Sequence, residues 1–109
     1  MAWLVHEDKV LASLDVANTR SERRRGLLGQ DSFDGALLIR PARSVHTFGM
    51  RFALDVAIVD EEGTVVALFA MKQRRVSRPR RRGVAIVEAS AGSFERWGLR
   101  VGDTLVFRE

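Results

Sequence analysis

The segment from residue 54 to residue 71 constrains the fold most, because its pattern is that of a β-hairpin. Two runs rich in β-branched residues, 54–59 and 64–71, flank the polar turn Asp60-Glu61-Glu62-Gly63. Gly63 can adopt a positive φ, and the Asp60 side chain can accept hydrogen bonds within the turn. β-Branched residues suit a pleated, partly buried surface. The chain is therefore expected to contain antiparallel sheet.

Other short apolar segments predict strands elsewhere in the chain. Residues 2–5 and 10–17 form a second candidate hairpin around the polar residues 6–9. Residues 36–39 (ALLI) are a continuous apolar run, which fits a strand buried on both faces. Two further strands are expected at residues 84–87 and 104–107.

Two short helices complete the expected elements. Thr19 and Glu22 have the spacing of a capping box, in which each side chain accepts from the other residue's backbone N–H. This helix is expected to pass through Gly26 and to end near Gly29. A second helix of one or two turns is expected at residues 91–97, closed by Gly98. Seven short strands without βα alternation predict an α+β, mostly β fold: a small antiparallel barrel or roll with two short helices.

Length and composition set the remaining bounds. A chain of 109 residues with 46% hydrophobic residues can close one modest core, so a single domain over residues 1–109 is expected. The absence of cysteine excludes disulfides, thiol chemistry and Cys-ligated zinc. No apolar run approaches the ~18 residues that cross a bilayer. Residues 1–17 lack the apolar core of a signal peptide, so a cytoplasmic location is expected.

Positive charge is concentrated in one segment, residues 72–82. The remaining 98 residues hold 11 basic against 14 acidic side chains, although the whole chain carries a net charge of +4. Such a segment either contacts phosphate, releasing condensed counterions, or is a solvated loop. No aromatic residue lies within it, so base stacking is not expected. The candidate phosphate-binding residues are Lys72, Arg74, Arg75, Arg78, Arg80, Arg81 and Arg82.

A second candidate site follows from polar residues in an irregular stretch and in two apolar strands. Asp55 interrupts the apolar run at 54–59, and a carboxylate buried there needs a partner, for which Arg43 or Arg51 is the obvious local choice. Glu88 follows Val87 at the end of another apolar run, and it would likewise need a partner if it is buried. Irregular segments often carry function. The candidate ligand-binding residues are His46, Thr47, Met50, Arg51, Asp55 and Glu88.

Three functional hypotheses remain open. The first is a binding or accessory domain, not an enzyme, for an unknown small ligand or protein. The second is nonspecific nucleic-acid binding through residues 72–82. The third is a hydrolase or metal-dependent enzyme that uses His46 with Asp55. The sequence contains no phosphate-binding loop, dinucleotide fingerprint, HExxH motif or nucleophile elbow, so no cofactor, metal or catalytic residue is assigned.

Several motifs taken in order resemble one family. They are Val16-Ala17-Asn18-Thr19, Arg25-Gly26-Leu27-Leu28, the central segment 45–55 (VHTFGMRFALD), Val87-Glu88-Ala89 and Val101-Gly102-Asp103. This arrangement is similar to that of the domain-of-unknown-function 192 family, an uncharacterised ancient conserved region, over roughly residues 10–107. The chain looks like a shorter, His-Thr-Phe-Gly-Met branch, with Ala53 where relatives usually have proline. The resemblance implies a compact, β-rich, barrel-like domain and no established reaction.

Overall fold

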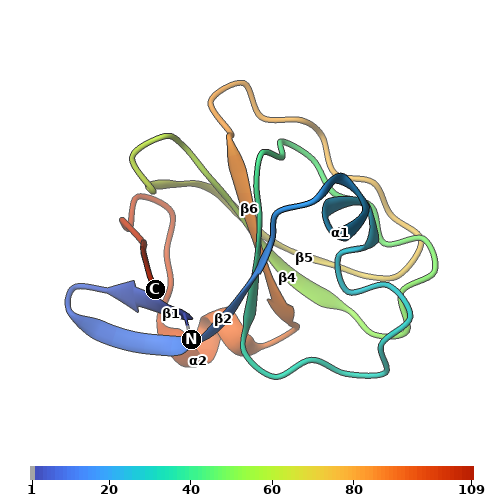
Figure 1. Cartoon of the computed structure of the whole chain (residues 1–109), viewed down its shortest axis with the longest axis horizontal. Helices are drawn as coiled ribbons and strands as arrows, with labels where there is room; N and C mark the ends of the chain where they lie inside the picture. Colours follow the sequence, from blue (N-terminus) through green and yellow to red (C-terminus); the bar gives the residue numbers. More distant parts are fainter. Residues whose placement is uncertain (1) are drawn as a thin grey trace.

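A single curled sheet of seven strands organises the chain, and the computed structural model describes residues 2–109 (Figure 1). The strands are β1 (Ala2–His6), β2 (Lys9–Ala17), β3 (Ala36–Ile39), β4 (Leu54–Val59), β5 (Val65–Met71), β6 (Ala85–Ser90) and β7 (Val106–Arg108). The helices are α1 (Arg20–Arg25) and α2 (Ser93–Trp97). The expected mostly β architecture with both hairpins is confirmed.

The strand order is β5-β4-β6-β3-β2-β1-β7. All neighbours are antiparallel except β2 and β3, which are parallel and are connected through α1. Parallel neighbours need a crossover connection, and the segment carrying α1 supplies it on one face of the sheet. With one parallel pair among six, the sheet is mostly antiparallel, as the sequence predicted.

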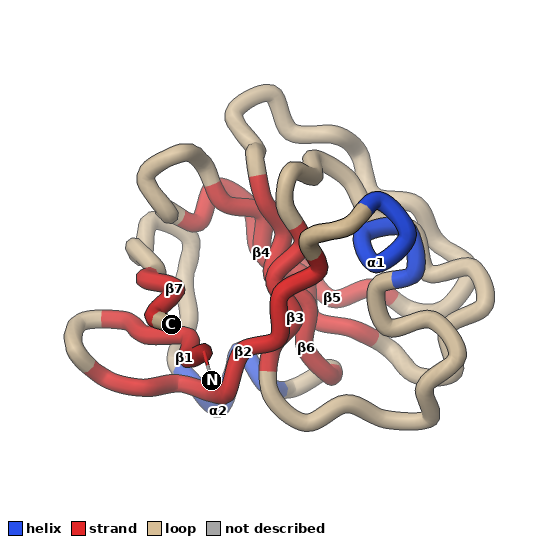
Figure 2. The backbone as a smooth tube through the Cα atoms, in the orientation of Figure 1, coloured by secondary structure: helices blue, strands red, loops and turns tan. Residues whose placement is uncertain are grey.

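The sheet curls into a half-barrel, and the segment that precedes β7 bonds to the turn that precedes β5 (Figure 2). Thr64 and Thr104 form an isolated antiparallel bridge, and the N–H of Leu105 donates to the carbonyl of Gly63 at 2.8 Å. Gly63 has φ +83°, and a Cβ there would lie 2.5 Å from the Leu105 carbonyl oxygen. Only glycine permits this close approach without displacing the backbone. Residues 104–105 therefore pair with this turn, and β7 begins at Val106, later than the predicted strand at 104–107.

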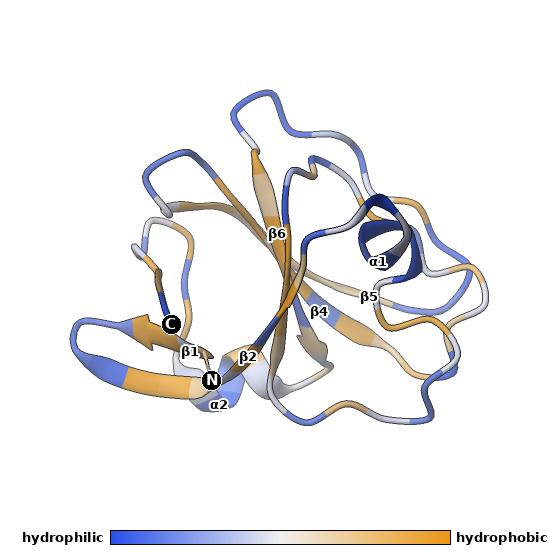
Figure 3. Cartoon of the chain, viewed as in Figure 1, coloured by the Kyte–Doolittle hydropathy of each residue, from blue (hydrophilic) through white to orange (hydrophobic). Residues whose placement is uncertain are grey.

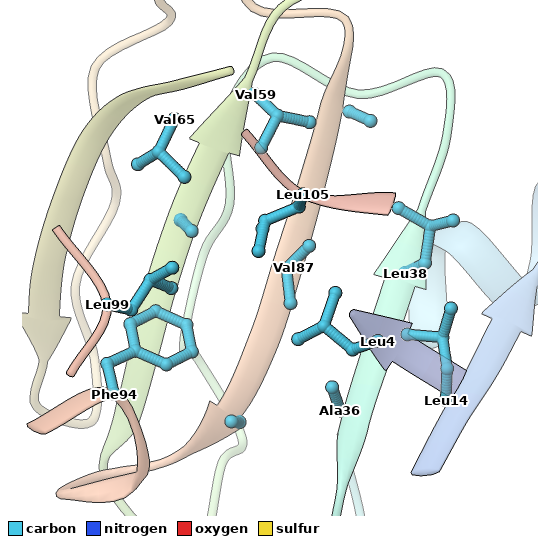
Figure 4. Packing of buried hydrophobic residues seen from close by; sticks show 13 residues of the cluster. Leu4, Leu14, Ala36, Leu38, Val59, Val65, Val87, Phe94, Leu99 and Leu105 are labelled. Atoms are coloured by element: carbon cyan, nitrogen blue, oxygen red, sulfur yellow. The ribbon is translucent and has the colours of Figure 1, made fainter. Parts of the chain in front are cut away.

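Apolar side chains fill both faces of the central strands. The inner cluster lies within the curl and includes Leu4, Leu38, Val59 and Val87, and Phe94 and Leu99 cover one end of it (Figure 4). The outer cluster includes Ile39, Val56 and Ile86, covered by Leu27 and Met50 from the connecting segments. Burial on both faces explains why residues 36–39 are apolar without alternation. The hydropathy colouring shows apolar strands and a strongly polar α1 (Figure 3).

Helix α1 is shorter than the sequence predicted. The capping box is present, since the Thr19 hydroxyl accepts from the Glu22 N–H and the Glu22 carboxylate accepts from the Thr19 N–H. The helix nevertheless ends at Arg25, and Gly26 is its C-cap with φ +50°. A positive φ at Gly26 stops the helix and turns the chain so that Leu27 enters the outer core. The prediction that the helix continues past Gly26 to Gly29 is wrong for this reason.

None of the helices formed by residues 2–109 is long and apolar enough to cross a membrane.

Candidate ligand pocket

A cavity of about 530 Å³ lies on the outer face of the sheet, between α1, the segment at 39–50 and β6. Helix α1 stands on the opposite side of the sheet from α2, so this cavity is separate from the inner core (Figure 1). Apolar side chains line its walls, one carboxyl lies at its floor and basic side chains stand at its rim. The apolar members are Leu27, Leu28, Ile39, Pro41, Ala42, Val45 and Met50.

Glu88 supplies the carboxyl. In the centre of the sheet it lies opposite Leu37 of β3 and Val56 of β4, and it is only 2% exposed. Its Oε1 is buried without a hydrogen-bond partner. Burial raises the pKa of this carboxyl to about 7, because the charged form is poorly solvated there. A buried acceptor without a donor is costly, and within residues 2–109 Oε1 of Glu88 is the one buried side-chain oxygen or nitrogen in this state.

Gly26 allows the chain to pass directly over this carboxyl. A Cβ at Gly26 would lie 3.2 Å from Oε1 of Glu88 and 3.7 Å from Cδ1 of Ile39. The same residue ends α1, so the turn that brings Leu27 into the core places a residue without a side chain over the carboxyl.

Four arginines of α1, at positions 20, 23, 24 and 25, line the cavity. Arg23 is half-buried and its guanidinium donates to the Asn18 carbonyl, whereas Arg20, Arg24 and Arg25 are exposed. Within residues 2–109 none of the four forms an ion pair. The rim therefore carries a strong positive potential above a floor that holds a single acidic group.

The sequence did not indicate this rim. In the sequence these arginines belong to a capped helix and nothing more. The crossover from β2 through α1 to β3 determines which surface they line. A run of basic residues on a short helix was the one available signal, and that pattern usually marks a solvated surface.

Three of the predicted ligand-binding residues do line the cavity: Glu88, His46 and Met50. His46 is exposed, and its ring lies 6.0 Å from that of Phe48 in a tilted arrangement. Met50 is buried and forms part of the wall. These residues come from separate segments, which the tertiary fold brings together.

Thr47 has a different role in the fold. It is fully buried, and its hydroxyl donates to the Lys72 carbonyl at 2.6 Å and accepts from the Arg75 N–H at 2.8 Å. The Thr47 N–H donates to the Arg75 carbonyl at 2.8 Å. Thr47 thus fastens the beginning of the basic segment to the loop that lines the cavity.

Arg51 and Asp55 do not pair with each other. Arg51 donates to the Asp31 carboxylate at 2.7 Å, at an exposed position. Oδ2 of Asp55 accepts from the N–H groups of Gly92 and Phe94, each at 3.0 Å. The expectation that Arg43 or Arg51 would neutralise Asp55 is wrong, because backbone amides of the segment entering α2 satisfy this carboxylate; the Arg43 side chain donates to the Arg80 carbonyl.

Asp55 also lies on the other face of β4 from the cavity. Its neighbours Leu54 and Val56 belong to the outer cluster, whereas Ala57, two residues on, belongs to the inner one. His46 lines the outer cavity. The His46–Asp55 pair that the enzyme hypothesis required is therefore not formed. Among residues 2–109 no group of three or more His, Asp or Glu side chains could hold a metal ion.

The basic segment 72–82 lies beside the same loop. His46 and Val76 form a bridge, the Ser77 N–H donates to the Val45 carbonyl at 2.8 Å, and the Val45 N–H donates to the Ser77 hydroxyl. All seven of its basic side chains are exposed: Lys72, Arg74, Arg75, Arg78, Arg80, Arg81 and Arg82. The loop at 43–47 thus separates two groups of basic residues, the α1 rim and residues 72–82.

The half-barrel sheet with two short helices places the chain among small, mostly β domains of the α+β class. The model of the domain-of-unknown-function 192 (DUF192) family, described as an uncharacterized ACR, matches residues 3–107. The chain belongs to this family, as its motifs indicated.

Two solved structures share the fold. A protein of unknown function from Novosphingobium aromaticivorans DSM 12444 has a TM-score of 0.82 at 16% identity, covering 96% of this chain and 82% of that chain. A protein from Sinorhizobium meliloti 1021, described as a candidate transcription regulator, has a TM-score of 0.80 at 18% identity, covering 97% of this chain and 91% of that chain. At such identities the likeness establishes the fold alone. No curated protein matches the chain in sequence.

Proposed function

We propose that this chain is a binding domain that takes a small polar ligand in the pocket above Glu88. The observation that carries the proposal is Glu88, which lines a cavity of about 530 Å³ and whose buried Oε1 has no donor from the described residues. Cavities of roughly this size hold small ligands, and a few convergent polar groups in an apolar wall give them orientation.

Two other features of the pocket support binding. The floor carboxyl is held by central strands and not by a mobile loop, so it is positioned before a ligand arrives. The arginines of α1 stand free of acidic partners in the part of the chain that the structure describes. Guanidinium groups bind carboxylates and phosphates well, so the rim favours an anionic group on the ligand.

An NMR titration with three six-carbon probes, hexanoate, hexylammonium and hexan-1-ol, tests this proposal. Binding of at least one probe should shift the amide signals of residues 24–28, 44–50 and 86–88. Ser44 is exposed and lines the cavity, so Ser44→Trp should obstruct the pocket and abolish these shifts. Ser32 is exposed and does not line it, and Ser32→Trp should bind as the wild type does. Failure of all three probes to bind, or equal binding by both variants, would overturn the proposal.

A second candidate function is binding of a nucleic-acid phosphate backbone. The observation that favours it is the placement of the two basic groups on either side of the loop at 43–47. Contacts with phosphate would be independent of base sequence and strongly dependent on salt.

A titration with a short mixed-sequence DNA duplex at low salt, followed by added salt, tests this candidate. Amide shifts should concentrate in residues 72–82 and α1 and should collapse as the salt rises. The triple variant Arg80→Gln, Arg81→Gln, Arg82→Gln should bind much more weakly than a charge-matched control in which exposed Arg40, Arg100 and Arg108 become Gln. Equal affinities of the two triple variants would contradict a role for this segment.

A further inference from the structure

The floor of the pocket lacks a hydrogen-bond donor. Glu88 faces apolar Leu37 and Val56 on the neighbouring strands, and Gly26 passes above its Oε1. Among the described residues, the other charged or titratable groups that line the cavity are the four arginines of α1 and His46, and none of them donates to Oε1 of Glu88. A donor brought by a ligand would remove the cost of the unsatisfied oxygen.

The rim, in contrast to the floor, carries hydrogen-bond donors. Its guanidinium groups are donors only and always positively charged, so they favour acceptors that carry negative charge. Glu22, the one acidic residue of α1, accepts from the N–H groups of Asn18 and Thr19 in the capping box. An anion bound at the rim would therefore have to come from a ligand.

Between floor and rim the walls are apolar, formed by Leu27, Leu28, Ile39, Val45 and Met50. A ligand polar along its whole length would lose hydration there without compensation. The middle of the ligand is accordingly expected to be a short hydrocarbon chain or ring.

We propose that the pocket takes a ligand with two unlike ends: an anionic group held by the arginines of α1, an apolar middle, and a hydrogen-bond donor, amine or hydroxyl, that reaches Glu88. This inference rests on the proposed function and deepens it by naming the class of ligand. An amine would pair with the ionised carboxylate, whereas a hydroxyl can bond either the ionised or the neutral carboxyl.

The test compares hexanoate with 6-aminohexanoate and 6-hydroxyhexanoate by NMR titration of the whole chain. In the wild type at least one of the two substituted probes should bind about tenfold more tightly than hexanoate, the gain expected for a hydrogen bond to a charged group. Tighter binding of the amine at pH 8 than at pH 6 identifies the ionised carboxylate as the partner, and a larger gain for the hydroxyl probe identifies an uncharged donor. Hexanoate that binds as tightly as both substituted probes overturns this inference while leaving the proposed function intact.

The variant Glu88→Leu tests the contact with Glu88, and its binding of hexanoate shows whether the variant is still folded. A leucine suits the apolar surroundings of position 88, so hexanoate should still bind and thereby report an intact pocket. The order of affinities should reverse, with hexanoate tighter than both substituted probes. If the substituted probes keep their advantage in Glu88→Leu, the donor does not reach Glu88 and the inference is overturned.

A double variant of α1 tests the contact between the arginines and the anionic group of the ligand. In the double variant Arg20→Gln, Arg24→Gln, all three carboxylate probes should bind more weakly and with less dependence on salt, while the gain from the second polar group should persist. Unchanged affinity of hexanoate in this variant would overturn the assignment of the anion to the rim.

Discussion

The backbone N–H of Phe94 donates to Oδ2 of Asp55 at 3.0 Å, which ties the beginning of α2 to a strand 39 positions earlier in the chain. The N-cap residue of α2 is Gly92, which has no side chain to accept from the first turn. The Asp55 carboxylate, which belongs to β4, accepts from the first turn instead, and it also accepts from the Gly92 N–H. The carboxylate in the apolar strand thus holds in place the helix whose Phe94 covers one end of the inner core.

Asp55→Ala is expected to lower the free energy of unfolding by about 2–3 kcal/mol, because it leaves the buried Phe94 N–H without an acceptor. Urea denaturation measures this loss. Asp55→Asn retains one acceptor oxygen and should lose less. Because Asp55 faces away from the pocket, both variants should bind the hexanoate probe as the wild type does. A fully stable Asp55→Ala that no longer binds would show that Asp55 belongs to the site.

Glu88 should make the stability fall with rising pH. Its pKa is raised from the ordinary 4.5 to about 7 in the folded protein, so between these values the unfolded chain is ionised and the folded chain is not. Stability is then lost as the pH rises from about 4.5 to 7, by up to roughly 3 kcal/mol, and is level above that range. Denaturation of Glu88→Gln across this range should lack this component. Parallel curves for the two proteins would contradict a buried, unpartnered carboxyl.

Thr47 is expected to order the basic segment through its hydroxyl. Thr47→Val keeps the shape but removes the bonds to the Lys72 carbonyl and the Arg75 N–H, at a cost of about 1–3 kcal/mol. Hydrogen exchange at the Arg75 amide should accelerate in this variant. Thr47→Ser retains the hydroxyl and should remain close to the wild type. Equal protection in all three proteins would mean that other contacts hold the segment.

The capping box of α1 should contribute stability mainly above pH 4.5. Hydrogen bonds from the backbone and side chain of Thr19, and from the backbone of Asn18, lower the pKa of the Glu22 carboxyl. A lowered pKa stabilises the fold above the unfolded value, and the contribution disappears as the pH falls through the folded value. The difference in stability between the wild type and Glu22→Gln should therefore shrink on acidification. A difference that grows towards low pH would contradict this sign.

Short-range signals predicted much of the fold. The 60–63 turn, the capping box at Thr19 and Glu22, and the glycine that ends α2 all act within a few residues, and the structure contains each of them. The helix end at Gly26 was missed, because that glycine was interpreted as an interior residue. Nothing nearby in the sequence signals that the chain must turn there to pass over Glu88.

The strands, the helices, their approximate bounds and the two carboxylates in apolar strands could be predicted from the sequence, because turn preferences, caps and apolar runs depend on neighbouring residues. The surroundings of those two carboxylates follow from the packing of the folded chain. Strand register placed Asp55 on the inner face beneath α2 and Glu88 on the outer face beneath the arginines of α1. Side chains alternate between the two faces along a strand, so partners are set by register and by the curl of the sheet, and both depend on contacts between residues far apart in the chain.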